Sequence, residues 1–308
     1  MHVFQNRHGG PVVVVFGSGG VVGSALQRQL AVAGYQATAA CAILWAQPVQ
    51  DISTQIDACL KRPALTQAQN KKLVVVWAAG AAGFGSSEQD TQKELAVFTA
   101  VLDQLQEHQL KLWPQTRLRF LLISSIGGLF EGITNIRPDS PISVRRPYGQ
   151  LKQAQEQLIA TQEGLSAGII RLPSVYSYIN VNKRMGLIQT MTRNALLRQI
   201  TPIFGSPTTL RDYVWADDIG RTVVHLCGAD TLSTQPYHLF SGRPASILYI
   251  HACLERCLGR SVHLSFHYEA HNALNITGHR VSYNGMWQPT DMTENITRIV
   301  DNALSQHI

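Results

Sequence analysis

Short unbroken apolar runs, set apart by longer helical patterns, constrain the fold of this chain most. Three of these runs are PVVVVFG at 11–17, KKLVVVWAAG at 71–80 and LRFLLISS at 118–125. A strand with one face in water alternates apolar and polar residues, so runs without that alternation indicate strands buried on both faces. The helical patterns between them supply the crossovers that parallel strands need. The pattern therefore predicts an α/β fold with a parallel sheet covered on both faces.

The predicted elements alternate regularly as far as Pro173. Further strands are predicted at 35–42 and 167–173, and helices at 22–34, 51–61, 88–108 and 148–163. Beyond Pro173 the pattern is irregular, apart from one helix and one strand within 211–242. We predict a doubly wound Rossmann-type domain of residues 11–173, to which 211–242 returns. A smaller C-terminal substrate-binding lobe would comprise 174–210 and 243–308, over the sheet edge where such folds bind ligands.

Composition excludes several classes of protein. The 308 residues are 45% hydrophobic, which is enough for a large core. Five cysteines, an odd number in a long chain, do not indicate a disulfide scaffold. Cys253 and Cys257 are four apart, but no neighbouring cluster completes a tetrahedral site, and the eleven histidines show no ligand spacing. We predict no metal site.

Charge and hydropathy bear on partners and location. The formal net charge is +6, with the basic residues scattered along the chain, whereas nucleic-acid binders concentrate them on one element. The first residues contain no apolar segment typical of a signal peptide, and no run approaches the length of a membrane span. We expect a soluble cytoplasmic protein that binds neither nucleic acid nor membrane.

A glycine-rich loop follows the first apolar run. Gly17, Gly20 and Gly23 are spaced by three, directly after a predicted strand and at the start of a predicted helix. A dinucleotide site needs this arrangement, because the backbone must approach a pyrophosphate at a helix N-terminus. The alternative is an ordinary glycine-rich strand-to-helix turn. In this position the loop predicts cofactor binding.

The choice between NAD and NADP rests on the end of the second predicted strand. Many NAD sites have an acidic residue there to hold the adenosine ribose, but Cys41 falls close to that place in this chain. No lysine or arginine occurs between Arg28 and Lys61 to neutralise a 2′-phosphate. The sequence favours NAD and leaves NADP open.

The segment PYGQLK places a tyrosine and a lysine four residues apart. Residues i and i+4 share one helix face, so Tyr148 and Lys152 can point into the same site, and Pro147 suits the first helical turn. A neighbouring ammonium stabilises a phenolate, which suits general acid–base catalysis near neutral pH. Two polar residues that merely share a helix face are the alternative.

Several segments together resemble a known family. In order and at about the expected spacing, the chain contains the glycine loop, VVWAAG, LLISSIGG, PYGQLK, GIIRLPSVY, LRDYVWADDIG and LFSGRPASIL. This combination resembles the extended short-chain dehydrogenase/reductases, and among them the NAD-dependent epimerase/dehydratase family, many of whose members act on nucleotide sugars. The resemblance reaches the tail, where MWQPT is similar to the family's GWxPxT.

The resemblance implies roles for particular residues. Ser125, Tyr148 and Lys152 would be catalytic, with Ser124 as a fallback because the loop after the serine departs from the family pattern. The implied cofactor contacts are Gly17, Gly20, Val21, Val22, Gly23, Asp51, Ile52, Ala78, Ala79, Gly80, Tyr148, Lys152 and Pro173. Ser125 and Arg211 would meet the substrate. On the residues alone, Asp51 could instead be a helix N-cap and Arg211 a structural ion-pair partner.

The resemblance also bears on the reaction. Family dehydratases carry Asp-Glu after the catalytic hydroxyl, and Ile126 and Gly127 stand there in this chain. We therefore expect an NAD(P)-dependent epimerase that acts on a nucleotide sugar by transient hydride transfer, with Tyr148 as acid/base. A ketoreductase or dehydrogenase is the alternative, and a redox-inactive nucleotide sensor or scaffold the third. The family's use of the helix at 88–108 in subunit contacts implies a homodimer, although its apolar stripe could equally face the sheet.

Overall fold

The chain forms two compact units. The computed structural model describes residues 1–62, 65, 72–111, 116–162, 164–180 and 185–306, so that Lys71 and Glu163, at the ends of two predicted elements, lie outside it. Unit 1 consists of Met1–Leu129, Val144–Arg171 and Gly220–Tyr237. Unit 2 consists of Phe130–Ser143, Leu172–Ile219 and His238–Ile308. Within the described ranges, no helix has the length and apolar character needed to cross a membrane.

A seven-stranded sheet forms the centre of unit 1, in the order β10-β6-β5-β4-β2-β1-β3. Its strands are β1 (His2–Asn6), β2 (Val12–Phe16), β3 (Tyr35–Ala40), β4 (Lys72–Trp77), β5 (Arg117–Ser125), β6 (Ser166–Leu172) and β10 (Tyr237–His238). β2, β4 and β5 are parallel neighbours, with Val14 opposite Val75 and Val76 opposite Leu121. The predicted α/β architecture with a parallel Rossmann-like sheet is confirmed.

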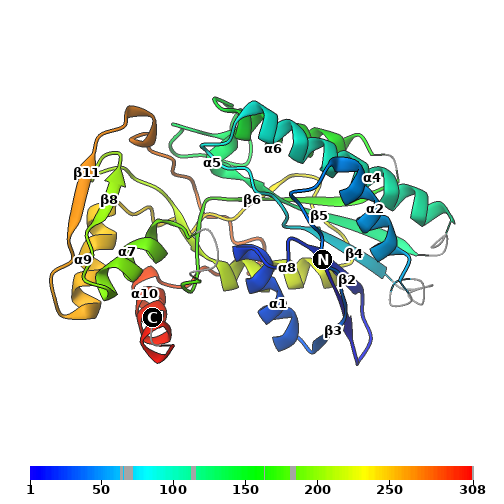
Figure 1. Cartoon of the computed structure of the whole chain (residues 1–308), viewed down its shortest axis with the longest axis horizontal. Helices are drawn as coiled ribbons and strands as arrows, with labels where there is room; N and C mark the ends of the chain where they lie inside the picture. Colours follow the sequence, from blue (N-terminus) through cyan, green and yellow to red (C-terminus); the bar gives the residue numbers. More distant parts are fainter. Residues whose placement is uncertain (63–64, 66–71, 112–115, 163, 181–184, 307–308) are drawn as a thin grey trace. The chain divides into compact units, whose positions relative to one another are not determined.

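Helices cover both faces of this sheet. Figure 1 shows α2 (Val49–Leu60), α4 (Glu88–Lys111) and α6 (Pro147–Ala160) on one face, and α1 (Val21–Val32) and α8 (Ala216–Gly228) on the other. The predicted helices are thus present, with ends shifted by a few residues.

The apolar stripe of α4 packs on the sheet. Phe98, Leu102 and Leu105 are buried in the unit's own core, and the Phe98 ring lies 5.9 Å from that of Phe120 in β5. The stripe was predicted to face either a second subunit or the sheet, and in the structure these three residues face the sheet. The stripe therefore gives no support to a subunit contact.

Strand β1 was not predicted, and it changes the order of the sheet. It runs antiparallel between β2 and β3, with His2 opposite Val15 on one side and Ala40 on the other. Because neighbouring strands lie about 4.8 Å apart, β3 is one strand further from β2 than in a sheet where the two pair directly.

Unit 2 contains three main helices and two short parallel ribbons. The helices are α7 (Leu187–Leu196), α9 (Ile247–Leu258) and α10 (Met292–Ser305); the ribbons pair β8 (Thr201–Phe204) with β11 (Leu264–His267), and β7 (Ser174–Tyr176) with β9 (Tyr213–Trp215). A short helix, η1, spans Ala270–Asn272. These elements share a second apolar core, in which the rings of Tyr176 and Trp215 lie 5.3 Å apart.

Asp212, just before β9, holds the loop at residues 241–243. One carboxylate oxygen accepts the N–H of Ser241 at 2.8 Å, and the other accepts the N–H of Gly242 at 3.0 Å and the Ser241 hydroxyl at 3.0 Å. The side chain is 1% exposed. Burial raises the pKa of Asp212 to about 6, despite these hydrogen bonds to the ionised form.

Replacing Asp212 by Asn should change how stability depends on pH. The folded pKa lies above that of an unfolded aspartate, so the folded protein binds this proton more tightly. The resulting stability is fully present below about pH 4 and is lost as the pH rises through about 6. Between these values wild type should lose on the order of 2 kcal/mol relative to Asp212→Asn, measured by urea unfolding. The exposed-site variant Asp301→Asn should keep the wild-type slope. Parallel curves for wild type and Asp212→Asn would contradict the assignment.

Candidate cofactor and catalytic site

The glycine loop forms a tight backbone cradle between β2 and α1. Gly17 has φ +72°, and a Cβ added to it would lie 2.3 Å from the carbonyl oxygen of Ala78. A Cβ on Gly23 would lie 2.2 Å from the carbonyl oxygen of Gly17, so α1 lies directly against the loop. Gly20 is less crowded, because its nearest contact would be at 3.3 Å. α1 begins at Val21 without a side-chain cap, and such a helix N-terminus favours an anion. The cradle fits a dinucleotide pyrophosphate.

Other predicted cofactor residues lie after β4 and in the first turn of α2. Ala78, Ala79 and Gly80 follow β4 beside the glycine loop. Asp51 lies in the first turn of α2, whose N-cap is Pro48, so the alternative that Asp51 is itself the N-cap is wrong.

Three further predicted residues lie in the core of unit 1 or in unit 2. Ile52 is 1% exposed and belongs to the core of unit 1. Pro173 and Arg211 belong to unit 2. There the backbone of Arg211 pairs with Ala245, and its guanidinium donates to the Asn272 carbonyl at 3.3 Å.

Tyr148 and Lys152 share one face of α6. The lysine ammonium lies 5.8 Å from the centre of the tyrosine ring and donates to the side-chain oxygen of Gln155 at 2.9 Å. Lys152 is buried, whereas Tyr148 is half-buried. A Cβ on Gly128 would lie 3.1 Å from the tyrosine ring, and the Phe84 ring meets it edge-on at 5.8 Å. The tyrosine ring is thus held between Gly128 and Phe84 beside a buried cation.

The two serines that end β5 differ in their partners. Ser124 is buried and donates to Glu156 at 2.5 Å, and Glu156 is paired with Arg171 at 2.6 Å. Ser125 is half-buried and accepts the N–H of Gly128 at 3.1 Å. Gly128 also lies against the tyrosine ring, so Ser125 is the serine whose hydrogen-bond partner adjoins Tyr148, whereas Ser124 is bound to Glu156.

Glu94 is a site residue that the sequence analysis missed. It lies on α4, and one carboxylate oxygen accepts the N–H groups of Ala81 and Ala82 at 2.9 and 3.0 Å. The other oxygen lies 3.8 Å from the Lys152 ammonium, and both side chains are largely buried. Glu94 therefore joins the segment after β4 to Lys152.

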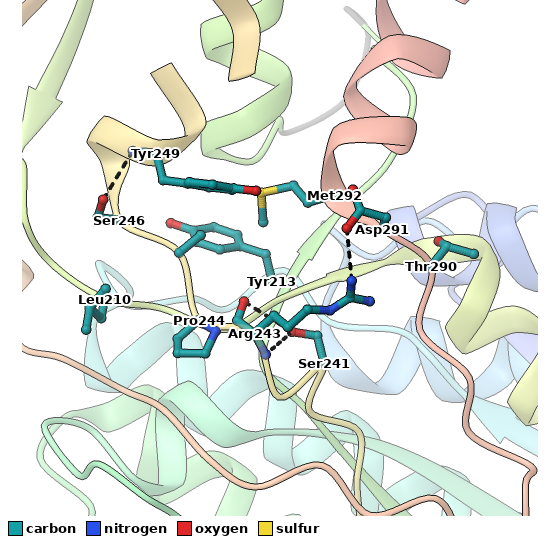
Figure 2. A pocket seen from close by; sticks show the side chains of 11 residues that line it. Leu210, Tyr213, Ser241, Arg243, Pro244, Ser246, Tyr249, Thr290, Asp291 and Met292 are labelled. Atoms are coloured by element: carbon teal, nitrogen blue, oxygen red, sulfur yellow. Dashed lines mark hydrogen bonds and ion pairs between the residues drawn. The ribbon is translucent and has the colours of Figure 1, made fainter. Parts of the chain in front are cut away.

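Unit 2 contains a separate pocket of about 230 Å³. Figure 2 shows the side chains of Tyr213, Tyr249 and Met292 around it, with the ion pair of Arg243 and Asp291 at 2.9 Å. None of the residues predicted for the site lines this pocket. Among the described residues, no group of three or more histidines, cysteines or acidic residues could hold a metal ion.

The fold and the unit 1 site together define a class of protein. A glycine cradle after the first parallel strand and a tyrosine–lysine pair on a helix following a later strand are the features of a dinucleotide-dependent enzyme. The model of the NAD dependent epimerase/dehydratase family matches residues 13–238. The chain belongs to this family. Membership confirms the expected NAD-dependent enzyme of the short-chain dehydrogenase/reductase type, with NAD as cofactor.

Known proteins resemble the chain at two levels. A dTDP-L-rhamnose 4-epimerase of Burkholderia thailandensis is 28% identical over 129 residues, which is 39% of this chain and 35% of that protein. The match thus spans about a third of that relative's length. The fold is similar to that of a UDP-glucose 4-epimerase from Thermotoga maritima, solved with UDP-glucose (TM-score 0.76, 16% identity, 96% of this chain and 99% of that one). A UDP-glucuronic acid 4-epimerase from Bacillus cereus, in complex with UDP-glucuronic acid and NAD, gives TM-score 0.74 at 20% identity, with the same coverage.

Alanine at two of the glycines should have different effects. In Gly17→Ala the new methyl group meets the backbone of Ala78 and the φ of +72° is strained, so unfolding should become easier by more than about 2 kcal/mol. In Gly20→Ala the methyl group fits the free protein with a small adjustment but stands where the pyrophosphate approaches. That variant should melt within a few degrees of wild type and bind NAD at least about tenfold more weakly, as measured by calorimetry. Tight NAD binding by Gly20→Ala would contradict the cradle assignment.

Proposed function

We propose that this protein is an NAD-dependent epimerase that inverts the 4-position of a nucleoside diphosphate sugar. The observation that carries the proposal is the Tyr148–Lys152 pair, whose tyrosine ring lies against Gly128, the hydrogen-bond partner of Ser125, in a family whose cofactor is NAD. The similar proteins named above are 4-epimerases of nucleotide sugars, which supports both the reaction and the substrate class. In this proposal the glycine loop binds the cofactor, Pro173 is a further cofactor contact, and Arg211 contacts the substrate.

The chain's own residues move the proton. When bound, NAD supplies a nicotinamide that accepts a hydride from the substrate carbon and returns it. The Tyr148 phenolate takes the proton from the hydroxyl on that carbon. It returns the proton after the keto sugar has rotated in the site to present its opposite face. Ser125 donates a hydrogen bond to the same substrate oxygen. The Lys152 ammonium, 5.8 Å from the tyrosine ring, stabilises the phenolate.

The segment after Ser125 supports a reaction without loss of water. Ile126 is fully buried and Gly127 has no side chain; a Cβ there would lie 2.9 Å from the Phe84 ring. This segment carries no carboxylate to act as the acid or base of a dehydration. Epimerisation needs only the proton carrier, the hydroxyl donor and the cofactor.

Tyr148→Phe should abolish turnover and leave cofactor binding intact. The phenyl ring keeps the packing against Gly128 and Phe84 but has no proton to transfer, so the rate should fall by a factor of about 10³. The measurement is conversion of UDP-glucose, UDP-glucuronic acid and dTDP-L-rhamnose to their 4-epimers, followed by NMR, with NAD affinity measured in parallel. Tyr268→Phe, at an exposed tyrosine, is the matched control.

Three results would contradict the proposed function. Wild-type rates in Tyr148→Phe would remove the tyrosine from the reaction. Net consumption of NADH with formation of an alcohol, and no epimer, would make the protein a reductase. Bound NAD without turnover on any nucleotide sugar would favour a redox-inactive sensor or scaffold.

Glu94→Gln should shift the pH dependence of the reaction. The amide keeps an oxygen that can accept the Ala81 and Ala82 N–H groups but removes the negative charge 3.8 Å from Lys152. Without that charge the net positive charge beside Tyr148 increases and favours a phenolate there, so kcat/KM on the acidic side of neutral pH should rise by a factor of up to about ten. The other nearby carboxylate, Glu156, is paired with Arg171 and is unchanged.

Two further variants separate charge from anchoring. Glu94→Ala loses the contacts to Ala81 and Ala82 as well, so it should also weaken NAD binding. Glu107→Gln removes an exposed carboxylate from the same helix and should leave the pH profile in place. An unshifted profile in Glu94→Gln would show that its charge does not act on the catalytic pair.

A further inference from the structure

Strand β1 brings His2 to the glycine loop. Because β1 runs antiparallel to β2, its first residues lie at the carboxyl edge of the parallel strands, where open α/β sheets bind ligands. The Nδ1 atom of His2 lies 2.6 Å from the hydroxyl oxygen of Ser18, the residue after Gly17 in the loop. His2 is half-buried. An imidazole is therefore fixed at the rim of the pyrophosphate cradle.

The same strand separates the loop from the residue that would ordinarily hold the ribose. In dinucleotide folds that residue is acidic and follows the glycine loop by about 20 positions, at the end of the next strand. Cys41 stands at the corresponding place here, and it is buried. Its N–H donates to the Met1 carbonyl at 2.9 Å, and the Met1 nitrogen donates to the Cys41 carbonyl at 2.8 Å. Residues 1 and 2 thus lie between Cys41 and β2, and the end of β3 is about 10 Å from β2.

We propose that His2 is the residue of this protein that contacts the adenosine ribose of the cofactor. The inference rests on the cofactor site of the proposed function and assigns to His2, on β1, the contact that an acidic residue at the end of β3 would ordinarily make. With Nδ1 engaged by Ser18, Nε2 is the nitrogen left to meet a ribose hydroxyl, as donor or acceptor according to the tautomer.

The charge of the site agrees with NAD as the ligand. Burial lowers the pKa of His2 and so favours the neutral imidazole, which suits a hydroxyl group. A cation does lie on the other side of β1, where the Arg62 guanidinium donates to the Ala40 carbonyl at 2.9 Å. If the ribose were held from the β3 side, Arg62 would be the side chain to contact it. A ribose contact by His2 and a ribose contact by Arg62 therefore predict opposite results for cofactor binding when one of these two residues is replaced.

The test is direct binding of cofactor fragments to the full chain by calorimetry. His2→Asn keeps a side-chain atom that can reach Ser18 but has none at the position of Nε2. Its Kd for NAD and for ADP-ribose should rise about tenfold, the loss expected for one hydrogen bond. Its Kd for nicotinamide mononucleotide should stay at the wild-type value. Arg62→Gln, the matched variant across β1, should bind all three ligands like wild type.

Each outcome decides the matter. ADP-ribose affinity that is unchanged in His2→Asn, or lost in Arg62→Gln alone, overturns the inference while epimerase activity and the proposed function stand. Failure of the wild-type protein to bind NAD overturns both. If His2→Asn does not fold, Ser18→Ala removes only the anchor of the ring. That variant should then lose affinity for ADP-ribose and not for nicotinamide mononucleotide, and equal losses for both would refute the assignment.

Discussion

The backbone contact between the glycine loop and the end of β4 is the constraint on which the candidate site depends. Gly17 adopts φ +72° with its Cα against the carbonyl of Ala78, and Gly23 brings α1 against the same loop. These approaches leave no room for side chains, so the carboxyl edge of the sheet becomes a bare backbone surface beside a helix N-terminus. A dinucleotide can be held there by main-chain groups, and the specificity of the site then falls to the few side chains around it.

Glu94 links that surface to Lys152, whose ammonium lies beside the Tyr148 ring. A single carboxylate binds the two N–H groups after β4 with one oxygen and faces the Lys152 ammonium with the other. One side chain therefore contacts both the segment after β4 and the ammonium beside Tyr148. Because the side chains of Glu94 and Lys152 are largely buried, their interaction is poorly screened by salt.

The sequence pattern predicted the strands that unbroken apolar runs reveal. It missed the elements whose place depends on contacts with residues distant in the sequence. β2, β4 and β5 were predicted because their apolar runs leave no other stable arrangement, and the tyrosine–lysine pair because helical spacing is local. β1 has only two fully buried residues in five, and its place between β2 and β3 depends on long-range pairing. Glu94 looks like any surface residue of an amphipathic helix until the fold places it against Lys152. The pocket beside Arg243 brings together distant segments, with Arg243 and Asp291 48 residues apart, which no local pattern reveals.

The position of β1 has a consequence for how this domain assembles. A short strand at the margin of a sheet can fray at little cost, but β1 is an interior strand, and β3 reaches the sheet only through it. The β1–β2 hairpin is a local structure that can form early, whereas β3 has no partner until that hairpin exists. The five residues of β1 therefore provide the backbone partner through which β3 joins the sheet. A change in β1 therefore acts on an interior position of the sheet and also on the pairing of its border strand β3.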